Sequence, residues 1–213
     1  MATRSKLLKV PYFTQPTENT CQSTVLKMFA TYIEREILKA DAGAIALKPV
    51  DIYAEINTSP DRPQKTFQNA HANIKWWLAK RFPTLTIHYS STSLDFEAID
   101  SIVHFIDSGF PVLVAVSHAK VAGHIVLVIG YEGYMDNATS MIFKLVVHDP
   151  YGAFDPSLLS DSYGKQRYDR GMCMQAGGEI GPGTGVRLDP LAASRQRKND
   201  ANKGTFYLMS ASR

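Results

Sequence analysis

The chain has 213 residues, of which 45% are hydrophobic and 20% are charged, so it can bury a sizeable core and is neither disordered nor collagen-like. With 23 basic and 20 acidic residues its net charge is +3, which permits an anionic partner without demanding one. Its two cysteines, Cys21 and Cys173, can build neither a disulfide framework nor a four-ligand zinc site on their own.

Helical periodicity dominates the first half of the sequence. A helix is predicted to begin near Thr20, with Asn19 or Thr20 as its N-cap. Its predicted buried face consists of Val25, Met28, Phe29, Tyr32 and Ile33. Further helices are predicted over 49–56 and 66–82, and a short strand over 85–89. The predicted apolar face of helix 66–82 consists of Phe67, Ala70, Ile74 and Leu78.

The clearest predicted helix spans 93–107. Ser93 is its expected cap, and Gly109 lies where a left-handed C-terminal cap belongs. Its predicted apolar face consists of Leu94, Phe96, Ile99, Ile102, Val103 and Ile106. In the preceding helix, Trp76 and Trp77 are adjacent and cannot share a face, so we expect one to pack inward and the other to be partly exposed.

The second half of the sequence changes to β-branched runs of strand length. Antiparallel strands are predicted over 112–116, 125–131 and 142–148, with Asp136 and Asn137 in the turn between the last two, and a closing strand over 205–209. The region from Asp149 to Gly185 lacks periodicity, and 156–200 is interpreted as irregular, either a lid or a subsite wall. Helices followed by strands predict an α+β fold, with N-terminal helices packed on an antiparallel sheet in a single domain over 1–213.

Cys21 lies in the first turn of the first long helix. The unpaired N–H groups and the helix dipole there favour a thiolate, the nucleophilic form of cysteine. By position alone, a buried structural cysteine is the commoner interpretation. Gln15, six residues earlier, carries an amide that could donate toward the same point as the Cys21 backbone N–H, as in an oxyanion hole, although Gln15 and Pro16 could simply open a loop.

His124 opens a predicted strand, and Asp149 follows the end of the next one. If the two strands form a hairpin centred between Asp136 and Asn137, His124 lies directly opposite Asp149. The histidine could then serve as a general base toward a cysteine, with the carboxylate orienting its ring. His118 is the competing histidine, but it lies in a predicted turn and is expected to be exposed.

These residues, in this order, resemble the active site of the papain-like cysteine peptidases, most closely the branch that holds bacteriocin-leader-processing peptidases and their stand-alone relatives. The resemblance covers about 8–155 and rests on the stretches VPYFTQPTENTCQST, SGFPVLVAV, GHIVLVIGYE and VHDPYG. It implies that Cys21 is the nucleophile, His124 the base and then the acid, Asp149 the orienting residue and Gln15 the oxyanion donor. Relatives commonly carry glycine after the catalytic cysteine; Gln22 stands here and could narrow the cleft or alter specificity.

The resemblance predicts a hydrolase that cuts a peptide or amide bond through an acyl-enzyme, without cofactor or metal. The substrate is either a cell-wall peptide, as for a phage lysin or an injected effector, or a protein such as a leader peptide; the mild basic charge slightly favours the anionic wall. An acyltransferase using the same acyl-enzyme remains open. A non-catalytic peptide-binding module is the third interpretation, disfavoured because all four site residues are present.

Nucleic acid and membrane partners are not expected. The cluster Arg195, Arg197, Lys198 and Lys203 lacks interleaved aromatic residues, and the glycines of 177–185 do not join a strand to a helix, so a flexible loop is predicted there. No run of about 18 apolar residues predicts a membrane span, and the basic start lacks the apolar stretch of a signal peptide. We therefore expect synthesis in the cytoplasm, with release by lysis or dedicated export if the protein acts outside the cell.

Overall fold

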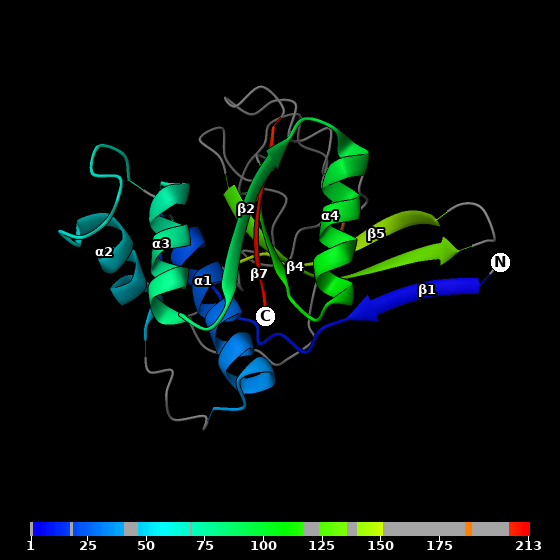
Figure 1. The fold of residues 1–213 in the computed structure, drawn as a ribbon, viewed down its shortest axis with the longest axis horizontal. Helices are drawn as coiled ribbons and strands as arrows, with labels where there is room; N and C mark the ends of the chain where they lie inside the picture. Colours follow the sequence, from blue (N-terminus) through cyan, green and yellow to red (C-terminus); the bar gives the residue numbers. More distant parts are fainter. Residues whose placement is uncertain are drawn as a thin grey trace.

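The computed structural model describes residues 2–17, 19–40, 47–68, 70–116, 124–135, 140–150, 186–188 and 205–213. Within these residues seven strands form one antiparallel sheet, in the order β2-β7-β3-β4-β5-β6, with β1 paired to β4 beside this path (Figure 1). The strands are β1 (Ala2–Leu7), β2 (Thr86–Thr92), β3 (Val112–Val116), β4 (His124–Met135), β5 (Ser140–His148), β6 (Val186–Leu188) and β7 (Phe206–Ser212). The α+β class predicted from the sequence is confirmed.

The helices are divided between the two faces of this sheet. They are α1 (Cys21–Tyr32), its π-helical continuation η1 (Ile33–Ile37), α2 (Pro49–Thr58), α3 (His71–Arg81) and α4 (Asp95–Asp107). On β2, Tyr89 contacts His71 of α3, whereas the preceding residue, His88, contacts Phe105 of α4. Successive side chains of a strand point to opposite faces, so α3 and α4 pack on opposite faces. Figure 1 shows α1, α2 and α3 gathered to the left of β2 and β7, and α4 to their right.

Helix α1 confirms the first predicted element. It begins at Cys21 with Thr20 as the N-cap residue. All five residues of its predicted apolar face are buried. Helix α1 packs against β4 and α2, and this contact fixes its start relative to the sheet. None of the helices in the described part of the chain is long and apolar enough to cross a membrane.

Helix α3 begins later than predicted, at His71 instead of 66. Side-chain hydrogen bonds hold the preceding segment in a loop: the Gln64 backbone N–H donates to Asn73 Oδ1 at 2.8 Å, and the Asn73 amide donates to the Gln64 carbonyl at 2.8 Å. Phe67 therefore stays outside the helix and is 67% exposed, contrary to its predicted place in the core. Trp77 is buried and Trp76 is partly buried, as the adjacent pair predicted.

Helix α4 also begins later than predicted. Its N-cap residue is Leu94, whose backbone N–H donates to Thr92 Oγ1 at 3.1 Å, so Ser93 does not cap the helix. Leu94 and Phe96 are 46% and 62% exposed, contrary to prediction, because the buried face begins one turn further along. Its buried core residues are Ala98, Ile102, Val103 and Ile106, with Ile99 partly buried. Gly109 has the predicted left-handed conformation, with φ of 88°.

The sequence did not predict the first strand, β1. It pairs with the outer half of β4 and is held against the end of α4, where Arg4 forms an ion pair with Asp107. The Lys6 ammonium donates to the Asp107 carbonyl at 2.7 Å, and the Tyr131 hydroxyl donates to the Asp107 carboxylate at 2.6 Å. A Cβ on Gly130 would lie 2.4 Å from the Lys6 carbonyl oxygen, so the close pairing of the two strands requires glycine there.

The remaining strands largely follow the prediction. β3 spans the predicted residues, β4 and β5 are longer than predicted, and β7 contains most of the expected closing strand. β6 is a short edge strand within the region 156–200 that was interpreted as irregular. The predicted turn at Asp136 and Asn137 lies outside the described residues.

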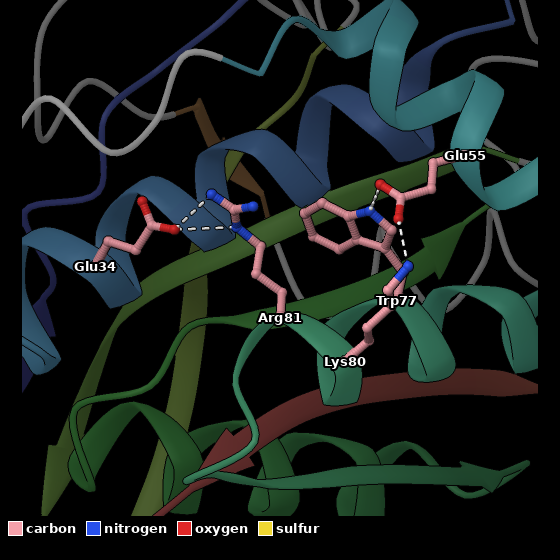
Figure 2. Close-up of a pocket in the computed structure, with 5 residues that line it drawn as sticks. All are labelled: Glu34, Glu55, Trp77, Lys80 and Arg81. Atoms are coloured by element: carbon pink, nitrogen blue, oxygen red, sulfur yellow. Dashed lines mark hydrogen bonds and ion pairs between the residues drawn. The ribbon is translucent and has the colours of Figure 1, made fainter.

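A polar network joins the helices on the side of α3 (Figure 2). Arg81 binds Glu34 of η1 through two nitrogens, at 2.7 and 3.0 Å, and the Trp77 indole N–H donates to Glu55 of α2 at 2.8 Å. Lys80 pairs with the other oxygen of Glu55 at 3.2 Å. These residues line a pocket of about 400 Å³. Because η1 continues the C-terminal end of α1, this pocket lies at the opposite end of that helix from Cys21.

Candidate active site

Cys21 is the first residue of α1 and is buried. The backbone N–H groups of a first helical turn have no partner within the helix, and together with the helix dipole they stabilise negative charge. The first turn of α1 contains no acidic residue that would oppose this effect. The position therefore favours a thiolate over a thiol.

His124 and Asp149 form a buried pair. His124 Nε2 lies 2.7 Å from Asp149 Oδ1, and the two residues are 3% and 2% exposed. The sequence predicted that these two residues lie close together, but the register of the hairpin differs from the predicted one by two residues. Leu127 lies opposite His148, so Asp149, one residue past the end of the ladder, comes opposite Val126. Val126 and His124 share a face of β4, so the carboxylate reaches His124 as a diagonal neighbour, not a direct one.

The charge state of His124 follows from its neighbours. Burial alone lowers the pKa of this imidazole, but the charge and hydrogen bond of Asp149, with a hydrogen bond to Cys21 and the charge of that residue, outweigh burial and raise the pKa well above its ordinary value. Asp149 engages Nε2, and the same imidazole also forms a hydrogen bond with Cys21. The surroundings thus favour an imidazolium beside Cys21.

Gln15 is 2% exposed and lies in the loop that leads to α1. Its backbone N–H donates to the Pro150 carbonyl at 2.8 Å, directly after Asp149. One N–H of its side-chain amide donates to the Thr17 carbonyl at 2.8 Å, and that carbonyl also accepts from Thr20 Oγ1 at 2.9 Å. A carboxamide has two N–H bonds, so the contact with Thr17 orients the amide and leaves its second N–H as a donor.

Two further residues contact this region and were not predicted from the sequence. The Tyr12 hydroxyl donates to the Asp149 carbonyl at 2.8 Å. His148 Nε2 donates to the Val10 carbonyl at 2.9 Å, and burial lowers the pKa of His148 to about 4, so this ring is neutral at neutral pH. The position of His148 at a strand end, beside Asp149, was the one signal that could have found it.

Several sequence-based candidates lie outside the described residues. They are His118, Cys173, the glycine-rich stretch 177–185 and the basic cluster Arg195, Arg197, Lys198 and Lys203. Gln22, which stands where relatives commonly carry glycine, is half-buried in the first turn of α1. The predicted roles of His118 and Cys173 stay predictions.

The fold, with helices packed on an antiparallel sheet and a cysteine at the start of α1, is that of a papain-like cysteine peptidase. A family model described as the Peptidase_C39 like family matches residues 7–170, and the chain belongs to this family. No curated protein sequence matches the chain. Among solved structures, the crystal structure of UfSP from C. elegans matches with a TM-score of 0.53 at 14% identity. The match covers 100% of this chain and 35% of that one, and at this identity it is evidence for the fold alone.

Proposed function

We propose that the protein is a thiol-dependent hydrolase that cleaves a peptide or amide bond with Cys21, His124, Asp149 and Gln15. The observation that carries this proposal is the buried 2.7 Å contact between His124 and Asp149, together with the hydrogen bond between His124 and Cys21 at the start of α1. A nucleophile, a base and a residue that orients the base together supply the groups that acyl-enzyme chemistry uses.

In the proposed first half-reaction, His124 Nδ1 takes the proton of the Cys21 thiol, and the thiolate attacks the carbonyl carbon of the substrate. The oxygen of the tetrahedral intermediate accepts hydrogen bonds from the Cys21 backbone N–H and from the second N–H of the Gln15 amide. His124 then gives its proton to the departing nitrogen, so the carbon–nitrogen bond breaks and an amine leaves.

The second half-reaction regenerates the enzyme. His124, now neutral, takes a proton from water, and the resulting hydroxide attacks the thioester carbon. Collapse of the second tetrahedral intermediate breaks the carbon–sulfur bond and releases a carboxylic acid. Asp149 stays ionised throughout and stabilises the imidazolium that forms twice in the cycle.

The proposed substrate is a peptide or a protein. Two sources fit this chemistry, the stem peptides of a bacterial cell wall and a leader or other protein, and the net charge of +3 slightly favours the anionic wall. We further propose that residues 1–213 act as one papain-like domain, which is supported by the pairing of β1 and β7 into the same sheet.

The test combines thiol alkylation with a substrate screen. Cys21 should react with iodoacetamide well below its ordinary pKa of about 8.5, and His124→Ala should slow that reaction, whereas Cys173 in the same chain serves as the internal reference. Purified cell-wall sacculi and unfolded casein are then incubated with wild type and Cys21→Ala, and new amino termini are counted. If Cys21→Ala releases as many termini as wild type, Cys21 is not the nucleophile.

A further inference from the structure

Asp149 lies just beyond the end of β5, where hydrogen bonds between strands no longer hold the backbone. β5 ends at His148, so the hydrogen-bond ladder with β4 stops one residue before the carboxylate that binds His124. A buried carbonyl at this position needs a partner from elsewhere in the fold. The side chain of Asp149 can be aligned with the imidazole only if its backbone is fixed by other contacts.

Those contacts come from the segment that leads to α1. The Tyr12 hydroxyl donates to the Asp149 carbonyl at 2.8 Å, and His148 Nε2 donates back to the Val10 carbonyl at 2.9 Å. The two rings pack together, with centroids 5.1 Å apart. Tyr12 and His148 are 4% and 1% exposed. Each segment thus uses a buried aromatic side chain to bind the backbone of the other.

A third contact extends this arrangement to Gln15. Its backbone N–H donates to the Pro150 carbonyl at 2.8 Å. The three hydrogen bonds link residues 10–15 with 148–150, and we name them together the strand-end clamp. Gln15 belongs to the first of these two segments and Asp149 to the second, so the same set of hydrogen bonds holds both residues in place.

We propose that Tyr12 and His148 are positioning residues that hold Asp149 in line with His124 and keep Gln15 at a fixed place beside the same strand end. This inference rests on the proposed function of Cys21, His124, Asp149 and Gln15. Neither Tyr12 nor His148 takes part in the chemistry; both act through the backbone of the residues that do. Without these hydrogen bonds the Asp149 carboxylate can turn away from His124 Nε2. The imidazolium of His124 is then less stable, and so is the thiolate of Cys21.

Tyr32 provides a matched control within the same chain. Its hydroxyl donates to the Gly109 carbonyl at 2.9 Å, and the residue is 5% exposed. Tyr12→Phe and Tyr32→Phe thus each remove one buried hydroxyl from one backbone carbonyl, with the ring retained. The two variants should lose similar amounts of thermal stability. Of these two variants, only Tyr12→Phe removes a hydrogen bond of the strand-end clamp.

The readout is the rate of Cys21 alkylation by iodoacetamide from pH 5 to pH 9, measured on the full chain by peptide mass. We expect Tyr12→Phe to slow alkylation at neutral pH by about tenfold and to move the rise of the profile to higher pH, because small misplacements of a catalytic group cost about this much or more. Tyr32→Phe should keep the wild-type profile. His148→Leu should resemble Tyr12→Phe, whereas His148→Gln, which keeps a donor of similar reach, should restore the wild-type rate.

The outcomes separate the two proposals. If His124→Ala and Asp149→Ala shift the profile but Tyr12→Phe behaves like Tyr32→Phe, the clamp is overturned and the proposed active site stands. If neither His124→Ala nor Asp149→Ala alters Cys21 reactivity, the proposed site itself fails, and the clamp falls with it. A His148→Gln protein that folds but is as slow as His148→Leu would also contradict the positioning role, since the donor is present in it.

Discussion

Graded replacement of Asp149 tests how its charge and its hydrogen bond contribute to the site. Asp149→Asn removes the negative charge but can still accept from His124 Nε2–H, whereas Asp149→Ala removes both. In the structure the contact is 2.7 Å long and both residues are buried, so the bond is charge-assisted and poorly screened. A bond to a charged partner contributes about 1.5–3 kcal/mol and a neutral one about 0.5–1.5 kcal/mol.

The difference between the midpoints of these ranges, about 1.2 kcal/mol, predicts that Asp149→Asn slows Cys21 alkylation and substrate turnover by about eightfold. Asp149→Ala leaves a buried N–H without its partner, which costs roughly 1–3 kcal/mol more and should slow both by about fiftyfold to a thousandfold. The pH profile should move as well. Burial alone lowers the pKa of His124, so loss of the carboxylate lowers the pKa of this imidazole and moves the rise in Cys21 reactivity toward the ordinary thiol pKa of about 8.5.

The measurement is the alkylation rate of Cys21 against pH, with Cys173 as the internal reference and the exposed Asp61→Asn as the charge-matched control. A wild-type profile in Asp149→Ala would refute the reasoning, because the carboxylate would then contribute neither charge nor orientation. An Asn variant slower than the Ala variant would refute the assigned order of charge and hydrogen bond.

Three further predictions concern other parts of the molecule. Gln15→Ala should lower turnover about a hundredfold, as expected for one lost oxyanion donor, while the alkylation rate of the thiol changes little. The pKa of the His148 imidazole falls from 6.5 to about 4 on folding, so the unfolded chain binds more protons than the folded chain below pH 6.5. The free energy of unfolding should therefore drop by about 3 kcal/mol between pH 6.5 and pH 4. Thermal melts of wild type and of His148→Gln, which should lack this loss, test the prediction. Arg81→Met should destabilise the fold by about 2–3 kcal/mol in urea because it leaves the buried Glu34 carboxylate unpaired, with Cys21 reactivity unchanged.

Local signals were sufficient for the helices and strands with strong periodicity. The apolar face of α1 and the β-branched run of β3 lie where the pattern predicts them. β1 was missed because its sequence is polar and basic: Arg4 and Lys6 resemble a solvated tail until Asp107, about a hundred residues later, supplies their partner. A single sequence holds no information on that pairing, so the strand becomes recognisable only in three dimensions.

The hairpin that brings His124 toward Asp149 shows a different limit. The turn chemistry predicted the pairing of the two strands, but the ladder is displaced by two residues from the symmetric arrangement already at its turn end, where Met135 lies opposite Ser140, and the two register shifts further along cancel. A displacement of two residues keeps His124 and Asp149 on the same face of the sheet, so the two side chains lie close together although the predicted register was wrong. A displacement of one residue would have placed the carboxylate on the opposite face of the sheet.

The sheet that carries the candidate site includes a strand, β7, that contributes none of the site residues. β7 lies between β2 and β3, and β3 pairs in turn with β4, where Val116 stands opposite His124. Residues 206–212, about eighty positions after the histidine, thus support the strand that pairs with the start of β4. The stretches that identify the site end near 155, whereas the strand that borders β3 lies at 206–212. The long sequence separation between β3 and β7 predicts that these two strands pair late in folding, because closing a long loop costs more entropy than closing a short one.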